Sequence, residues 1–229
     1  MFAIVVAFTM FFPFVLEVSR APVVASGPGV AGCYADPSAE WHFTWSADAG
    51  GRPWCIPMLR SNRLDNVGAT MNSCGNPCNA ILVGNEMESQ EGCWVDCQAE
   101  FLHRVYPSIM DENPAAQVIF WNGAYPSAGW VSLFVHEWNR LFPGEPLPDV
   151  DVGVHLYLYE NHGPETLLRR LRNFEDSVHS AWQDANVVVT EGGSLSSRER
   201  HNVWLSEVAP HLSDYAVFDR WLIYKEQSR

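Results

Sequence analysis

The sequence predicts an α/β fold, a (β/α)8 barrel of the TIM type that is reduced in its N-terminal third. Eight short segments are rich in Val, Ile, Leu and aromatic residues, and some, such as Ile81–Val83 and Val187–Val189, are wholly apolar. Wholly apolar strands are typical of parallel sheets buried on both faces. From the fourth segment on, strands alternate with helical periodicity, which indicates successive βαβ units. Eight such strands favour a closed barrel over an open sheet.

The first part of the predicted barrel is simpler than the rest. Short connections join the first three strands and leave little room for helices between them. The sequence ends soon after the eighth strand, so we expect the last helix to be short or absent. The expected strands are Val30–Tyr34, Trp41–Trp45, Trp54–Leu59, Ala80–Asn85, Gln117–Asn122, Val150–Tyr159, Asn186–Glu191 and Tyr215–Tyr224.

Helical periodicity and capping residues define four long helices. Ser127 is a suitable N-cap for the second helix, and Pro143-Gly144 follow it as a stop signal. Pro164 suits the first turn of the third helix. No internal repeat or low-complexity linker divides the chain, so we expect a single domain over residues 28–229. The predicted helices are Trp94–Met110, Ser127–Leu141, Pro164–Trp182 and Ser196–Leu212.

The first residues predict a signal peptide. Met1–Leu16 is almost wholly apolar, which matches the length of a signal-peptide core and is short for a membrane span. Small residues follow at Ala25, Ser26 and Gly27, where cleavage would release a secreted, extracellular protein. The usual basic residues before the apolar core are missing, so a wrongly assigned start or a buried first strand are the alternatives. No other segment is suited to span a membrane.

Charge and composition restrict the partners. The formal net charge is -13, from 27 acidic and 14 basic residues, and such a field repels nucleic acids and anionic membrane surfaces. The chain contains 10 Trp, whose flat apolar faces suit ring stacking in a ligand cleft; a Trp-rich core is the alternative. We expect a monomer that binds neither nucleic acid nor membrane.

Six cysteines in a chain that is predicted to be exported favour disulfide bonds. Four of them form two C-x3-C pairs, whereas structural zinc sites usually contain C-x2-C. A nested pairing, Cys74 with Cys97 and Cys78 with Cys93, would clamp the base of a loop, but the sequence leaves the connectivity open. The six are Cys33, Cys55, Cys74, Cys78, Cys93 and Cys97.

Two glutamates follow predicted strands at the end of the barrel where function is found. Glu86 comes after Ile81–Gly84, and Glu191 after Val187–Thr190. In a parallel barrel, active sites lie at the C-terminal ends of the strands. Two carboxyl groups in one pocket suit glycosidic cleavage, because one protonates the leaving oxygen while the other reacts at the anomeric carbon. The alternative is that each glutamate caps the helix that follows it.

These motifs resemble a known family. Gly84-Asn85-Glu86 and Thr190-Glu191 are similar to the clan A retaining glycoside hydrolases, in which the Asn–Glu pair carries the acid/base and the later Glu is the nucleophile. Three stretches resemble the W-x-Y-x-W, F-V-P-M-L and H-x-Y motifs of the "glycosyl hydrolase catalytic core" branch, which includes endo-β-1,3-glucanases. They are Trp41–Trp45, Cys55–Leu59 and Val152–Tyr157, and the resemblance covers residues 40–224.

The resemblance implies a retaining hydrolase of β-linked polysaccharides or oligosaccharides, with Glu86 and Glu191 as catalytic residues. The sequence has no P-loop, no dinucleotide fingerprint and no H-E-x-x-H pair, so we expect neither a cofactor nor a metal ion. Two departures from the motifs of this branch limit how far its substrate preference carries over to this chain. Met87-Glu88 stands where the branch has Pro–Asp, and Gly192-Gly193 stands where it has an aromatic residue. A non-catalytic carbohydrate-binding barrel is therefore the first alternative, and a metal protein built on the cysteines the second.

Further residues at strand ends are predicted to bind the substrate. Asn85 would donate to the sugar 2-hydroxyl. His155 and Tyr157 would orient the carboxylates, with Tyr157 as the partner of the nucleophile; a core role is the alternative for His155. Glu88 and Glu160 are interpreted as solvated loop charges. The residues expected to be sugar platforms or hydroxyl partners, unless they pack in the core, are Trp45, Trp121, Asn122, Tyr159 and Trp221.

Overall fold

The computed structural model describes residues 28–31, 42–51, 55–63, 65–75, 77–194, 196–212 and 217–219. The predicted leader, Cys33 and Trp221 lie outside these residues. No helix in the described part of the chain combines the length and the apolar character that a membrane span needs.

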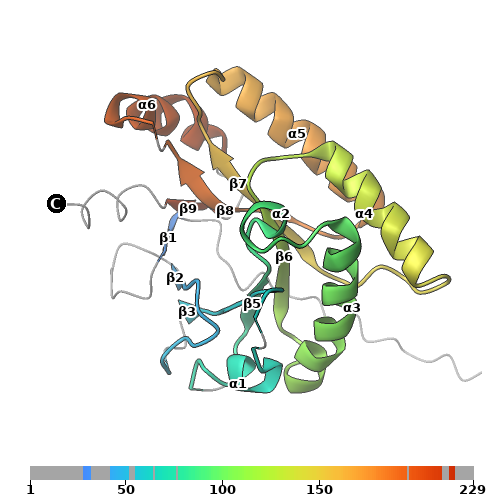
Figure 1. The fold of residues 1–229 in the computed structure, drawn as a ribbon. Helices are drawn as coiled ribbons and strands as arrows, with labels where there is room; N and C mark the ends of the chain where they lie inside the picture. The colour runs from blue at the N-terminus through green and yellow to red at the C-terminus, as the bar shows by residue number, and fades with distance from the viewer. Residues whose placement is uncertain are drawn as a thin grey trace, which may run out of the picture.

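All strands of the structure belong to one parallel sheet that closes on itself (Figure 1). The run Cys55–Leu59 is divided at Pro57 into β3 and β4; β3 pairs with β2, and β4 pairs with β5. Because one run borders both neighbours, the strands form the predicted eight-stranded barrel. They are β1 (Pro28–Ala31), β2 (His42–Phe43), β3 (Cys55–Ile56), β4 (Met58–Leu59), β5 (Ala80–Val83), β6 (Gln117–Gly123), β7 (Asp151–Tyr157), β8 (Val187–Gly193) and β9 (Val217–Asp219).

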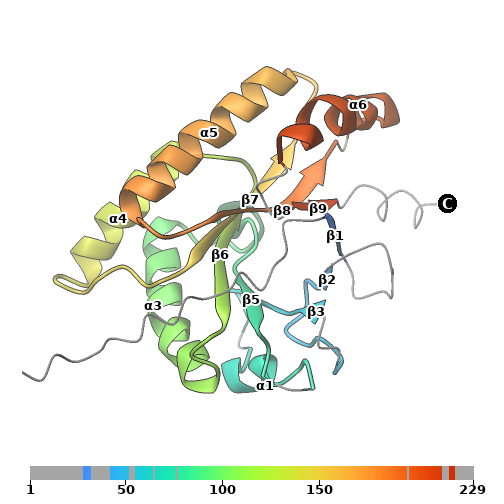
Figure 2. The same ribbon diagram turned by 180° about the vertical axis from the view of Figure 1, so that it is seen from behind.

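The helices lie mainly against the second half of the barrel. Figures 1 and 2 show α3, α4 and α5 along one side of the strands. Between β1 and β4 the described residues contain no helix, which agrees with the predicted reduction of the N-terminal third. The helices are α1 (Val67–Met71), α2 (Met87–Gln90), α3 (Val95–Glu112), α4 (Ala128–Leu141), α5 (Pro164–Ala181) and α6 (Arg198–Val203), the last continued by a π-helical turn (Trp204–Val208) and a 3-10 turn (Ala209–Leu212).

Local sequence explains where these helices begin. The Ser127 hydroxyl accepts a hydrogen bond from the Trp130 amide at the start of α4, and Ser197 caps α6 in the same way through Arg200. Pro164 occupies the first turn of α5, where its missing N–H is not needed. The helix predicted over Ser196–Leu212 is therefore present, but only its first part is α-helical.

Alternation along the strands separates an inner core from an outer one. In β7, Val152, Val154 and Leu156 belong to the outer core that packs against the helices, whereas His155 and Tyr157 face the inside of the barrel. The inner core fills the barrel with apolar side chains from earlier positions of the strands and leaves the C-terminal rim to polar groups. Its members are Phe43, Ile56, Met58, Ala80, Leu82, Ile119 and Val188.

A bulge in β6 changes which side chains face inward. Trp121 and Asn122 have positive φ angles of 77° and 50°, and the pairing of β6 with β7 shifts between Phe120 and Gly123. Trp121 consequently stays on the outer side, where it is buried and its ring stacks on Trp130 with centroids 4.0 Å apart. The expectation that Trp121 forms a sugar platform was wrong, because the bulge packs it beneath α4.

The disulfides pair cysteines that are close in sequence. Cys74 bonds to Cys78 and Cys93 to Cys97, with Cα–Cα distances of 5.5 and 5.2 Å, so the nested pairing was wrong. Cys97 lies in the first turn of α3, and Cys93 lies just before that helix begins. Since these four sulfurs are all bonded in disulfides, the alternative of a zinc site on the two C-x3-C pairs is also wrong. Cys55 is disulfide-bonded as well.

Candidate active site

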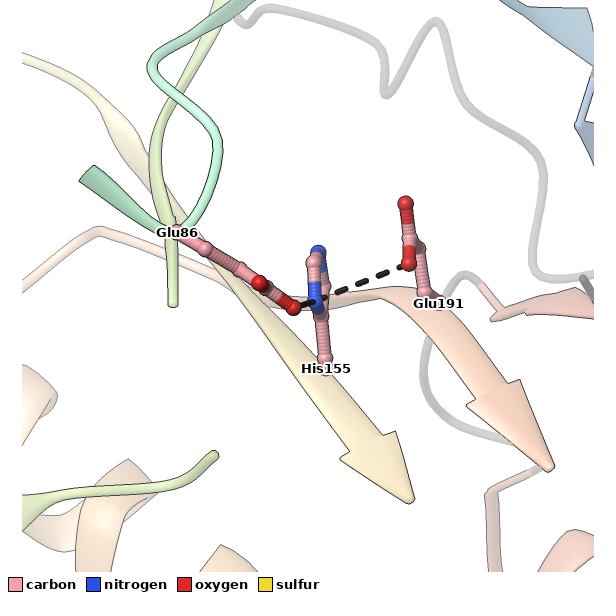
Figure 3. A group of neighbouring side chains, drawn as sticks. All are labelled: Glu86, His155 and Glu191. Carbon is pink, nitrogen blue, oxygen red and sulfur yellow. Dashed lines mark hydrogen bonds and ion pairs between the residues drawn. The ribbon is translucent and has the colours of Figure 1, made fainter. Parts of the chain in front are cut away.

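Glu86 and Glu191 meet at the C-terminal rim of the barrel. Glu86 follows β5 and Glu191 lies near the end of β8, with His155 of β7 between them (Figure 3). One carboxylate oxygen of each glutamate and Nδ1 of His155 all lie within 4.8 Å of one another. The Glu86 side chain is 15% exposed and that of Glu191 only 1%. Glu86 is therefore the more accessible of the two carboxylates.

One imidazole nitrogen faces both carboxylates. Nδ1 of His155 lies 2.9 Å from Oε1 of Glu86 and 3.6 Å from Oε2 of Glu191. The residue is fully buried, and among the described residues its Nε2 has no hydrogen-bond partner. The ring thus directs its polar contacts toward the two glutamates, as predicted for His155.

Two further side chains orient Glu191. The Tyr157 hydroxyl donates to Oε2 at 2.5 Å, and the Trp45 indole N–H donates to Oε1 at 2.9 Å. Both carboxylate oxygens are therefore hydrogen-bonded, which offsets the loss of water around a buried charge. Trp45 comes from the loop after β2, so its contact links the first part of the barrel to β8. Its ring also meets Phe43 edge-on.

Glu86 occupies a turn of unusual conformation. It precedes α2 in the left-handed region, with φ 46° and ψ 50°, and its side chain makes no capping hydrogen bond to that helix. The alternative that Glu86 merely caps the helix is therefore wrong. Its Oε2 instead accepts a hydrogen bond of 2.5 Å from the Gln90 side chain. Gly84 begins the turn with φ +84°, and a Cβ there would lie 2.3 Å from the sulfur of Met87.

Asn122 of β6 holds this turn through two hydrogen bonds. The Asn122 carbonyl accepts from the Glu86 amide at 3.0 Å, and its side-chain amide donates to the Gly84 carbonyl at 2.8 Å. Asn122 is fully buried, so it supports the turn. The prediction that Asn122 contacts the sugar was wrong. Of the described non-glycine residues, Glu86, Trp121 and Asn122 have positive φ. Such strain concentrates at functional sites.

Glu91 supports the same turn from the other end of α2. Its carboxylate accepts from the Asn85 amide at 3.0 Å and from both the amide and the hydroxyl of Ser61 at 2.6 Å. Asn85 is buried, and its side-chain amide donates to Gln90 Oε1 at 3.2 Å. The amide of Gln90 thus bridges Asn85 and Glu86, because its other end binds Glu86.

Two sequence-based interpretations of charged loop residues had different outcomes. Glu88 was interpreted as a solvated charge, but it accepts a hydrogen bond of 2.9 Å from the Trp121 indole and is half-buried, so that interpretation was wrong. Glu160 is exposed, as expected. The contact of Glu88 ties α2 to the bulge in β6.

Tyr159 stands beside the carboxylates at the rim. It is 41% exposed and meets Tyr157 edge-on with ring centroids 6.3 Å apart. Burial raises the pKa of its phenol, and the negative charges of Glu86 and Glu191 raise it further. The hydroxyl therefore stays protonated and available as a hydrogen-bond donor next to both glutamates.

The glycine after Glu191 has a packing reason. A Cβ at Gly192 would lie 2.5 Å from the Trp204 indole ring, whose N–H donates to the Leu156 carbonyl at 2.8 Å. Gly192 thus faces the outer core. No aromatic side chain fits at this position while Trp204 occupies it.

The structure brings most of the predicted site residues together. Gln90 and Glu91 were missed, although Gln90 stands four residues after Glu86, the spacing of neighbours on a helix. Trp121 packs on the outer side of the barrel, and Asn122 is buried beneath the Glu86 turn. Trp221 lies outside the described residues. Those that converge at the rim are Glu86, Glu191, Asn85, His155, Tyr157 and Trp45.

The same cluster contains potential metal ligands. Among the described residues, Glu86, His155 and Glu191 form the group of potential ligands that lie close enough together to hold an ion. Their carboxylate oxygens, however, already accept hydrogen bonds from Gln90, Trp45 and Tyr157. Protein donors thus already bind these carboxylates.

Known structures share this barrel, although neither a family model nor a curated protein matches the sequence. An endo-β-1,3-glucanase of glycoside hydrolase family 128 from Lentinula edodes superposes with a TM-score of 0.57 at 12% identity, over 86% of this chain and 83% of that one. An exo-β-1,3-glucanase of the same family from Aureobasidium namibiae gives 0.57 at 16%, over 80% and 72%.

A family 17 β-1,3-glucanosyltransferase from Rhizomucor miehei gives a TM-score of 0.52 at 15% identity, over 80% of this chain and 75% of that one. The chain has the barrel fold of these glycoside hydrolases. The resemblance drawn from the sequence motifs is thereby confirmed at the level of the fold.

Proposed function

We propose that the protein is a retaining glycoside hydrolase of β-linked glucans, with Glu86 as acid/base and Glu191 as nucleophile. The carboxylate oxygens of these residues that lie within 4.8 Å of each other carry the proposal. Retaining enzymes place their carboxyl groups about 5–5.5 Å apart, whereas inverting enzymes need roughly 6.5–9.5 Å to admit a water molecule. The short separation therefore favours direct attack by Glu191.

The reaction proceeds by double displacement. A Glu191 oxygen attacks the anomeric carbon while the bond to the leaving oxygen breaks, and Glu86 transfers its proton to that oxygen. This step leaves a glycosyl ester on Glu191. Glu86 then removes a proton from water, whose oxygen attacks the anomeric carbon and releases Glu191. The first step releases the part of the glucan that carries the leaving oxygen. The second step releases the other part with a new reducing end.

The surrounding residues have distinct parts in this scheme. Tyr157 and Trp45 hold the Glu191 carboxylate through one hydrogen bond to each oxygen. His155 contacts the carboxylates of both steps. Asn85 donates to the sugar 2-hydroxyl, because its side chain lies beside the Glu86 turn.

A neutral polysaccharide fits the charge of the protein. The net charge of -13 disfavours anionic substrates. The similar structures include an endo- and an exo-β-1,3-glucanase, so β-1,3-glucan is the first substrate to test. The disulfides and the predicted apolar leader support secretion to the extracellular space, where such polymers are found.

Hydrolysis of a glucan panel tests the proposal. Purified wild type, Glu86→Gln, Glu191→Gln and the exposed control Glu160→Gln are assayed on β-1,3-, mixed-linkage and β-1,4-glucans. We expect Glu191→Gln to abolish turnover, Glu86→Gln to lower it about 10²–10⁴-fold, and Glu160→Gln to act like wild type. Binding of a glucan without turnover by wild type would instead establish a non-catalytic carbohydrate-binding barrel.

A further inference from the structure

In the described part of the chain, the exposed large aromatic residues lie at one end of the barrel. Among the described residues, the large apolar side chains that are exposed include three aromatic ones, Trp94 at 68%, Tyr125 at 56% and Tyr159 at 41%. All three lie on loops that follow strands β5, β6 and β7 at their C-terminal ends. The exposed Leu133 and Leu205 lie instead on α4 and on the π-helical turn. Of these exposed apolar side chains in the described part of the chain, the aromatic ones therefore share an end of the barrel with the carboxylates.

The three loops are neighbours. Strands β7, β6 and β5 are adjacent in the sheet, and β8 borders β7. Tyr159, Tyr125 and Trp94 therefore follow one another around the rim, from β7 next to the strand of Glu191 to β5, the strand that precedes Glu86. Tyr159 lies near enough to both glutamates for their charges to act on its phenol. The aromatic series therefore begins at the proposed cleavage point and continues past β6 to the loop that follows α2.

Hydrogen bonds hold the loops of Tyr159 and Trp94 in place. Arg200 of α6 donates to the carbonyls of Tyr159 and His162, at 2.7 and 2.6 Å. Next to Trp94, the side chain of Gln98 donates to the Cys93 carbonyl at 2.8 Å and accepts from the Trp130 indole at 2.7 Å. Loops fixed in this way lose little conformational entropy when a ligand binds.

We propose that Trp94, Tyr125 and Tyr159 form an aromatic rim that binds additional sugar units of a glucan chain on the side of the leaving group. The inference rests on the proposed hydrolase function and extends it. Flat aromatic faces with polar edges suit the apolar faces of neutral sugars. Glu86, the proposed acid, belongs to the same stretch of rim as Tyr125 and Trp94. The protein should therefore bind long chains more tightly than short ones.

Binding to an inactive variant tests the rim separately from catalysis. In a Glu191→Gln background, Trp94→Ala, Tyr125→Ala and their combination are titrated with β-1,3-glucan and with its disaccharide. We expect each single change to weaken polymer binding about three- to tenfold and the double change to weaken it more, with disaccharide binding unaltered. Leu133→Ala and Leu205→Ala serve as controls at exposed apolar positions on helical elements and should leave both affinities unchanged.

The outcomes separate the two proposals. Polymer affinity that survives the double change, or falls equally with the leucine controls, would overturn the aromatic rim even if hydrolysis is confirmed. Failure to bind any glucan of the panel would overturn it as well. Conversely, rim-dependent binding by a wild type that cleaves nothing would support the rim and contradict the hydrolase.

Discussion

Nδ1 of His155 lies 2.9 Å from a Glu86 oxygen and 3.6 Å from a Glu191 oxygen, so one buried ring contacts both proposed catalytic residues. No other nitrogen of the ring has a hydrogen-bond partner in the described part of the protein. When the ring carries its hydrogen on Nδ1, it donates to the carboxylates, and we expect the function of His155 to depend on this donor. A substitution that keeps this donor should differ from one that removes it.

His155→Asn and His155→Leu make this comparison. Asparagine carries an amide nitrogen near the position of Nδ1, whereas leucine has similar bulk and no donor. A hydrogen bond to a charged group contributes about 1.5–3 kcal/mol, so we expect kcat/KM of His155→Leu to fall about ten- to a hundredfold and His155→Asn to retain most of it. The exposed His136→Asn is the control. Equal losses in the two His155 variants would contradict a role of the donor.

Asn122→Ala tests the support of the Glu86 turn. The change removes the hydrogen bond from the Asn122 side chain to the Gly84 carbonyl inside the protein. We expect the free energy of unfolding to fall by about 1–3 kcal/mol, measured by urea denaturation, and kcat to fall more than KM rises because Glu86 loses its position. Asn139→Ala, on an exposed face of α4, should change neither. A stability loss with unaltered kcat would show that Asn122 is only structural.

Much of the barrel was predictable because its signals are local. The apolar run Val187–Val189 predicts a buried strand without knowledge of its neighbours. Because Glu191 follows this run, it could be predicted to lie at the C-terminal end of a strand. The bulge in β6 was not predictable, since nothing in Phe-Trp-Asn-Gly shows that Trp121 and Asn122 adopt positive φ. That bulge decided that Trp121 faces outward.

Side-chain partners at longer range were also hidden. In the sequence Glu91 is one of many acidic residues. In the structure it binds both Asn85 and Ser61, and Ser61 stands thirty residues before Glu91 in the chain. Disulfide bonds were expected from the cysteine count, but the sequence left their connectivity open, and it is the structure that pairs Cys74 with Cys78 four residues away. Placing such contacts requires the folded arrangement.

Disulfide mapping checks the local pairing. Proteolysis without reduction should yield peptides in which Cys74 is bonded to Cys78 and Cys93 to Cys97. A loop this short stabilises by about 2 kcal/mol in the chain-entropy treatment, so replacing both cysteines of one pair by serine should lower Tm by roughly 4–8 °C. Peptides that join Cys74 to Cys97 would contradict the pairing.

The ionisation of Tyr159 should reveal its position beside the glutamates. Its pKa is raised above 10.0 by burial and by the charges of Glu86 and Glu191. We expect the phenolate absorbance that Tyr159→Phe removes to titrate above pH 10, and to titrate lower in Glu191→Gln.

The same shift has a consequence for stability. Between the unfolded and folded pKa values the folded state binds more protons, so the contribution of Tyr159 is complete below pH 10 and is lost as the pH rises through the folded value. The alkaline decline in stability should be smaller in Tyr159→Phe. A Tyr159 titration at or below pH 10 would contradict its proximity to the carboxylates.

The most direct test of the account is the anomeric configuration of the first product. Proton NMR of β-1,3-glucan during early hydrolysis distinguishes the two anomers before mutarotation mixes them. Carboxylates as close as those of Glu86 and Glu191 predict that the β-anomer appears first, through an ester on Glu191. Initial appearance of the α-anomer would show that water attacks directly and would contradict the role of Glu191 as nucleophile.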